Sequence, residues 1–92
     1  MVEKLLPLRF SILKLLNTKV EGLNPYEIYE ELAPDYPNEK QCQPDTIDDH
    51  LMSMKGVGLV DEKSARYNEK QQLVTTYAIT DYGKGKVEQY IG

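Results

Sequence analysis

The segment from Pro44 to Gly83 constrains the fold of this 92-residue chain more than any other segment. Its first part, Pro44–Lys55, predicts an amphipathic helix, because apolar residues recur there at i, i+4 and i+7. Two glycines, Gly56 and Gly58, are placed to end that helix, since glycine commonly follows a last helical turn. The apolar face of the helix is formed by Ile47, Leu51 and Met54.

A β-hairpin is predicted directly after this helix. The apolar pair Leu59–Val60 begins a short first strand, and the polar stretch Ser64–Gln72 is expected to form a nine-residue loop. The second strand, Leu73–Ile79, is rich in residues of high β-propensity. The pair Thr80–Asp81 then supplies a cap for a last helix that ends near Tyr90.

Two further helices are predicted before this segment. The second of them begins with Asn24 as its cap, Pro25 at its first position and Glu27 at its third. It should end near Ala33, because the proline that follows disfavours helical geometry in the residue before it. The first is expected over about Pro7–Asn17, with an apolar face made by Leu8, Ile12, Leu15 and Leu16 and widened by Leu5, Phe10 and Leu13.

These elements predict an α+β fold with a three-helix core, a two- or three-stranded antiparallel hairpin and a C-terminal helix. A chain of this length is expected to form one domain, residues 1–92, with a modest core. Its 40% hydrophobic and 28% charged residues are ordinary for a soluble globular protein. The wide apolar face of the first helix is expected at the centre of the core or in a dimer contact.

The cysteine and histidine content excludes several classes of site. The sequence contains one cysteine, Cys42, and one histidine, His50, so neither an intrachain disulfide nor a four-ligand Cys/His zinc site can form. No catalytic triad or phosphate-binding glycine loop can be built, and we expect neither an enzyme nor a cofactor. With no signal peptide or membrane span recognisable, the expected compartment is the cytoplasm.

The chain resembles the winged helix-turn-helix superfamily, and within it small regulators similar to the PadR and MarR groups. The resemblance covers nearly the whole chain and is carried by four segments, taken in order. Each is a loose pattern alone, but their order and spacing are those of the family. They are "ILKLLN" from Ile12, "NPYEIYEEL" from Asn24, "TIDDHLMSMKGVGLVDEK" from Thr46 and "YAITDYGKGKVEQY" from Tyr77.

This resemblance implies a transcriptional regulator that contacts duplex DNA through its third helix and its hairpin, called the wing, and that forms a homodimer. In the wing, the expected DNA contacts are Lys63, Arg66, Tyr67 and Lys70, since wings commonly enter the minor groove or follow phosphates. The alternative for these residues is a solvated hairpin whose charges protect a strand edge from aggregation.

In the third helix, exposed side chains are expected to meet base edges and phosphates. The candidates are Gln43, Asp45, Thr46, Asp49, Met52 and Ser53.

The charge of that helix conflicts with this role. Residues 21–62 contain eleven acidic and two basic residues, whereas both flanking segments are basic. A carboxylate about 6 Å from a phosphate is repelled by roughly 0.7 to 3 kcal/mol. Two alternatives therefore stand beside DNA contact. The aspartates lie on a solvated face near the positive end of the helix, or the acidic helix binds a basic protein partner.

Overall fold

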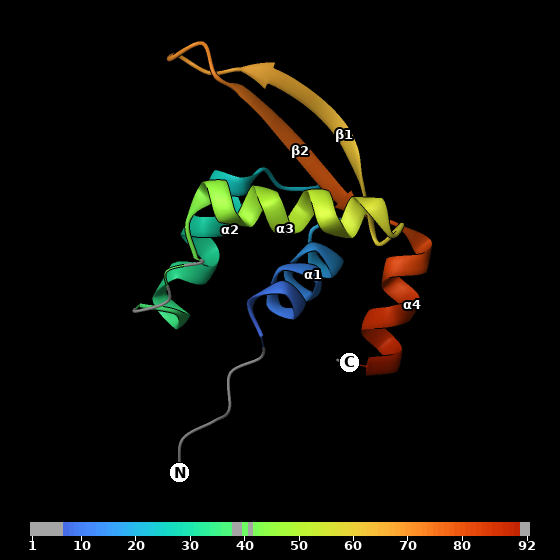
Figure 1. The fold of residues 1–92 in the computed structure, drawn as a ribbon. Helices are drawn as coiled ribbons and strands as arrows, with labels where there is room; N and C mark the ends of the chain where they lie inside the picture. Colours follow the sequence, from blue (N-terminus) through green and yellow to red (C-terminus); the bar gives the residue numbers. More distant parts are fainter. Residues whose placement is uncertain (1–6, 38–39, 41, 91–92) are drawn as a thin grey trace.

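The computed structural model describes residues 7–37, 40 and 42–90, and the element order is the predicted one (Figure 1). Four α-helices and a hairpin give the expected α+β fold, with a 3-10 turn, η1, after the second helix. The hairpin rises from the end of α3 and leans back over that helix, while α4 stands at its base. The elements are α1 (Leu8–Thr18), α2 (Pro25–Leu32), η1 (Ala33–Asp35), α3 (Pro44–Gly56), β1 (Val60–Tyr67), β2 (Leu73–Ile79) and α4 (Asp81–Tyr90).

The core lies where α1, α2 and α3 meet, and the base of the hairpin and α4 close it. The predicted apolar face of α3 is buried, and so are most of the predicted positions of α1. Leu13 is buried as well, but Phe10 remains half exposed, and Leu5 lies outside the described residues. Among the described residues, the largest side chains with almost no exposure are Ile12, Leu16, Ile28, Cys42, Ile47, Leu51, Met54 and Val60.

The predicted helix caps are present. In α2, Asn24 Oδ1 accepts the Glu27 amide at 2.9 Å, and the Asn24 amide donates to Glu27 Oε1 at 2.9 Å. This reciprocal pair satisfies two amides that would otherwise lack partners. At α4, Thr80 Oγ1 accepts the Gly83 amide at 3.0 Å, which makes Thr80 the cap residue.

The predicted boundary between the first strand and its loop is wrong. Strand β1 continues to Tyr67, so only Asn68–Gln72 connect the strands. Ser64–Tyr67 pair with the first four residues of β2, with an irregularity in register at Lys63. Because every β1 residue after Val60 is exposed, this strand shows no apolar alternation, and its extent is set by pairing with β2.

A single bridge adds a rudimentary third strand to the hairpin. Leu23 and Tyr77 exchange two backbone hydrogen bonds of 2.9 Å, N–H of each to C=O of the other. Gly22 permits this approach, because its φ of +92° favours glycine and a Cβ there would lie 2.7 Å from the Tyr77 carbonyl oxygen. The bridge anchors the inner end of β2 to the segment between α1 and α2.

Gly83 lets α4 pack closely against the base of the hairpin. A Cβ at this position would overlap the Leu59 carbonyl oxygen and lie 2.7 Å from Ile79 Cγ1. Two residues later in the same helix, Gly85 is exposed and a Cβ there would meet nothing within 4 Å. A side chain is therefore excluded by close packing at Gly83 but not at Gly85, so the two positions can be compared in one helix.

We predict that Gly83→Ala lowers the free energy of unfolding by about 1 to 3 kcal/mol, because the added methyl group forces the helix away from the hairpin. Gly85→Ala should raise it by about 0.5 to 1 kcal/mol, because alanine loses less entropy in a helix. Urea denaturation of the two variants measures both effects. Equal responses of the two would contradict the close packing at Gly83.

Candidate nucleic-acid interface

A cleft of about 410 Å³ lies between the outward face of α3 and the underside of the hairpin. The N-terminal turn of α2 also lines it, through Pro25 and Tyr26. From α3 it receives Asp45, Asp48 and Met52, and from the hairpin chiefly Glu62, Leu73 and Tyr77. The cleft therefore combines three carboxylates with apolar and aromatic side chains.

Asp48 and Tyr77 connect the two walls of this cleft. The Tyr77 hydroxyl donates to Asp48 Oδ1 at 3.3 Å, while the Tyr77 ring is buried. Partial burial raises the pKa of Asp48, and the nearby carboxylates of Asp49 and Glu62 add to the rise, although the hydrogen bond from Tyr77 opposes it. Burial and the Asp48 charge raise the pKa of Tyr77 to about 12. Tyr77 is therefore a hydrogen-bond donor throughout the physiological range.

The third-helix candidates mostly lie on the outward face of α3, as predicted. Gln43, Asp45, Asp49, Met52 and Ser53 are exposed. Asp45 and Met52 line the cleft.

Thr46 is half buried, and its hydroxyl has a local role. It donates to the Gln43 carbonyl oxygen at 3.0 Å and lies 3.3 Å from the Gln43 amide, which it accepts. The side chain of Thr46 is therefore engaged in capping α3.

All four wing candidates are exposed, but they lie in different parts of the hairpin. They are Lys63, Arg66, Tyr67 and Lys70. Lys63 lies at the irregularity in β1, and Lys70 lies in the connecting loop. Arg66 and Tyr67 line a second hollow, of about 370 Å³, together with Asn24 and Glu27 of the α2 start. The structure thus places Arg66 beside the start of α2 rather than in the acidic cleft.

Two solved structures resemble this chain over most of its length. One is TA0346 from Thermoplasma acidophilum, described as a transcriptional regulator. It is 30% identical over 91% of this chain and 76% of its own, with a TM-score of 0.70. The other is the PadR-like transcriptional regulator BC4206 from Bacillus cereus, which is 20% identical over 89% of this chain and 75% of its own, with a TM-score of 0.66.

At 30% identity over most of both chains, this chain belongs with the transcriptional regulators that TA0346 represents, and it has the fold of the PadR-like regulator BC4206. The expected fold is thereby confirmed, and both solved neighbours are described as regulators rather than enzymes. No family model and no curated protein matches the sequence.

Hydrogen bonds that have no signal in the sequence hold the wing tip, residues 68–72. Asn68 Oδ1 accepts the amides of Lys70 at 2.9 Å and Gln72 at 3.0 Å, which orders the loop around Gln71 with its φ of +62°. Gln72 Oε1 accepts from Asn68 Nδ2 at 3.1 Å and from the Tyr26 hydroxyl at 3.4 Å. Tyr26 therefore links the wing tip to α2.

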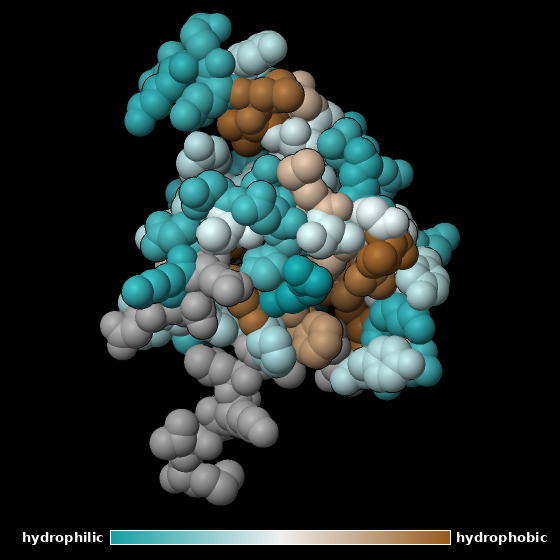
Figure 2. Space-filling model, viewed as in Figure 1, coloured by the Kyte–Doolittle hydropathy of each residue, from teal (hydrophilic) through white to brown (hydrophobic). Residues whose placement is uncertain are grey.

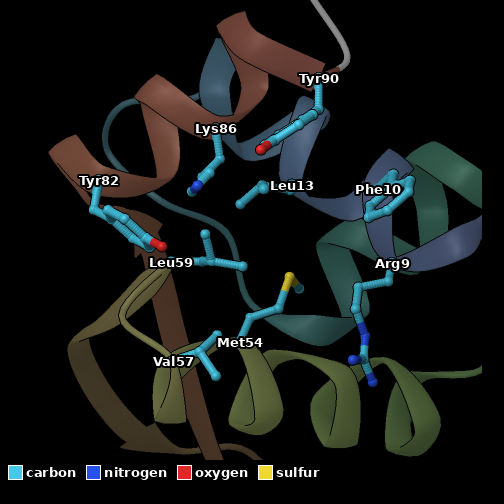
Figure 3. Close-up of a pocket in the computed structure, with 9 residues that line it drawn as sticks. All are labelled: Arg9, Phe10, Leu13, Met54, Val57, Leu59, Tyr82, Lys86 and Tyr90. Atoms are coloured by element: carbon cyan, nitrogen blue, oxygen red, sulfur yellow. The ribbon is translucent and has the colours of Figure 1, made fainter.

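A separate apolar groove of about 420 Å³ lies between α1, the end of α3 and α4 (Figure 3). Lys86 Nζ lies 5.2 Å from the ring centroids of both Tyr82 and Tyr90, within the range of a cation–π contact. Figure 2 shows apolar surface where α3 approaches α4, and a second apolar area near the outer end of the hairpin. Apolar side chains lining the groove include Phe10, Leu13, Met54, Val57 and Leu59.

Arg9, on the rim of this groove, is also tied to α3. The His50 Nδ1 atom accepts from Arg9 Nε at 3.3 Å and lies 3.1 Å from Arg9 Nη2. Partial burial lowers the pKa of His50, and the Arg9 charge adds to the decrease, while Asp49 opposes it. A neutral imidazole is the form that accepts these hydrogen bonds. His50 therefore lies at the boundary between the core and the surface.

Neither a metal site nor a reactive cysteine is supported by the described residues. No group of three or more His, Cys, Asp or Glu side chains among them is arranged to hold a metal ion. Cys42 is buried in the core with 2% of its surface exposed, where a thiol is a packing group. The helices in the described ranges are all too short or too polar to cross a membrane.

We predict that Asp48→Asn stabilises the folded chain at pH 7. The raised pKa means that the folded state binds this proton more tightly than the unfolded state, so stability is lost as pH rises from 3.8 through the folded pKa. Asparagine keeps an oxygen for the Tyr77 hydroxyl and removes the charge. Urea denaturation between pH 3.5 and pH 7 measures the difference.

The matched control for this variant is Asp35→Asn, which removes an exposed carboxylate in η1 outside the cleft. It should leave the pH dependence of stability close to that of the original chain. If Asp48→Asn were less stable than the original chain at pH 7, the pKa of Asp48 would not be raised in the folded state.

Proposed function

We propose that this PadR-like chain regulates transcription in the cytoplasm by binding duplex DNA through α3 and the wing. One observation carries the proposal. The exposed face of α3 and a hairpin that carries three exposed basic side chains lie on two sides of one open cleft, in a chain whose solved neighbours are transcriptional regulators. The chain's own contacts from α2 and α3 hold that hairpin in place.

The dimensions of α3 suit the major groove. An α-helix with side chains is about 10 to 12 Å wide, and the B-DNA major groove is about 12 Å wide. The outward side chains proposed to reach bases or phosphates are Gln43, Asp45, Asp49, Met52 and Ser53. Thr46 contributes by fixing the start of the helix.

The wing supplies the attraction that the helix lacks. Lys63, Arg66 and Lys70 project from the hairpin, and Tyr67 is 67% exposed beside them. Arginine suits the negative potential of a narrow minor groove, and lysine in the loop suits phosphate. Because the hydrogen bond from Tyr26 to Gln72 restrains the loop, less entropy is lost when these side chains meet DNA.

The acidic cleft also suits a basic protein partner, which is the second candidate function. The regulators among the solved neighbours favour DNA instead. Charge reversal at Asp45 separates the two candidates, because lysine there strengthens DNA binding and weakens binding of a basic protein.

We predict that replacing Arg66 and Lys70 by glutamine weakens duplex binding. The plot of log K against log salt concentration should become less steep by about 1.8, because each lost phosphate contact removes about 0.9 from the magnitude of its slope. Fluorescence anisotropy with random-sequence duplexes at several salt concentrations measures the slope. The matched control replaces Lys14, in the middle of α1, and Lys19, its C-cap residue, by glutamine and should leave the slope nearly unchanged. Absence of any duplex binding by the original chain would overturn the proposed function.

We also propose that the regulator is a homodimer in which α4 of a second copy occupies the groove between α1, α3 and α4. The groove has an apolar floor and a cationic rim formed by Arg9 and Lys86. On α4, Glu88 is exposed and complements that rim in charge. Dimers of helix-turn-helix proteins bind two half-sites with matching symmetry, which gives the dimer a role in DNA recognition.

We predict that Glu88→Lys converts the dimer to a monomer of 10.6 kDa in sedimentation velocity, because it places like charges at the rim. Glu21→Lys, which changes an exposed acid between α1 and α2, is the control and should remain dimeric. Adding Lys86→Glu to Glu88→Lys restores opposite charges and should restore the dimer. A monomeric original chain would contradict this part of the proposal.

A further inference from the structure

We propose that α3 reads pyrimidines in the major groove, with Asp49 accepting from a cytosine amino group and Met52 contacting a thymine methyl group. The inference rests on the proposed function and names the base-pair chemistry that this DNA-binding surface prefers. It assigns specificity to two exposed side chains that stand on the same side of the helix.

The base-edge code limits what these side chains can recognise. In the major groove, cytosine offers an amino donor and thymine offers a methyl group, whereas guanine offers only acceptors. An ionised carboxylate only accepts hydrogen bonds, so Asp49 has no partner on guanine. It can accept from the amino group of cytosine or of adenine, and cytosine suits it better because the adenine amino group lies beside the acceptor N7. Met52 is 57% exposed and apolar, and the thymine methyl is the apolar feature of the groove.

No arginine or lysine of α3 is directed outward to recognise guanine. The commonest specific contact in protein–DNA complexes is arginine or lysine to guanine. Between Pro44 and Gly56 the only such residue is Lys55. Its Nζ lies 3.3 Å from Glu62 Oε1, which directs it toward the hairpin.

The spacing of the two side chains fits neighbouring base pairs. Asp49 and Met52 are three residues apart, which places them on one face with a rise of about 4.5 Å along the helix. Successive base pairs are about 3.4 Å apart. The two contacts therefore fall on base pairs one or two steps apart.

In this arrangement, the negative charge of α3 increases sequence specificity. A carboxylate repels phosphates at every site, so it weakens binding to all sequences. It regains interaction where the amino group of a base, best that of cytosine, meets it. Specificity is a difference between affinities, and a group that penalises wrong sites more than right ones increases that difference.

The first experiment selects duplexes from a random pool with the original chain and then replaces single thymines in the selected site by deoxyuridine. Removing the methyl group under Met52 should weaken binding about fourfold, the effect of one buried carbon group. In Met52→Ala the same replacement should have almost no effect. Met52 is exposed, so this variant is expected to fold, and circular dichroism checks that it does.

The second experiment repeats the selection with Asp49→Asn. Asparagine pairs with the adenine edge, so one position should change from cytosine to adenine with a preference of roughly 5- to 150-fold. Overall affinity should rise as well, because a charge is removed. The readout is therefore the base preference, which a general gain in affinity does not move. Asp35→Asn is the control and should select the original sequence.

The outcomes separate the inference from the function it rests on. Duplex binding with an unchanged selected sequence in Asp49→Asn, or with a deoxyuridine effect that persists in Met52→Ala, overturns the pyrimidine reading and leaves the DNA-binding function standing. Failure of the original chain to bind any duplex overturns both. A base change confined to one position, together with loss of the methyl effect, establishes the inference.

Discussion

Tyr77 is the residue on which the geometry of the cleft depends. Its backbone forms the bridge to Leu23, its ring is buried in the core, and its hydroxyl reaches Asp48. These three contacts join the hairpin to the loop before α2 and to α3. A two-stranded hairpin alone is marginally stable in water, so its direction must be set by what it packs against. Because Tyr77 fixes the inner end of β2, the outer end is directed over α3, where Tyr26 restrains the loop through Gln72.

The features that the sequence predicts well are those with a local cause. The cap at Asn24, the apolar stripe of α3 and the strand Leu73–Ile79 each follow from neighbouring residues, and each was predicted close to its observed limits. The extent of strand β1 has no such local cause. Ser64–Tyr67 are exposed and mostly polar, and their extended conformation depends on pairing with β2. The contact of Tyr26 with the wing joins residues 46 positions apart and depends on how the hairpin twists. Such a contact has no local signal.

The same distinction applies to the candidate interface. Exposure of Asp45, Asp49 and Met52 on α3 follows from helical periodicity, and the structure has them exposed. The position of Arg66 does not follow from the sequence, because it depends on which face of β1 turns toward α2. With Glu27 lining the same hollow, Arg66 lies in a less positive field than the sequence of the wing alone suggests. Lys70, in the loop, and Lys63, at the irregularity in β1, are the other basic side chains of the hairpin.

Placing attraction and discrimination on different elements resolves the conflict between an acidic helix and DNA binding. Phosphate contacts position a protein without reading sequence, and base contacts specify. The wing carries three exposed basic side chains, Lys63, Arg66 and Lys70, beside the acids Asp61, Glu62 and Glu69, and the outward face of α3 carries carboxylates, a thioether and small polar groups. A helix freed from the task of attracting phosphate can use groups that repel it, provided that the wing holds the duplex nearby. The hydrogen bonds of Tyr77 and Tyr26 make this division possible, because they keep the attracting and reading elements at a fixed separation.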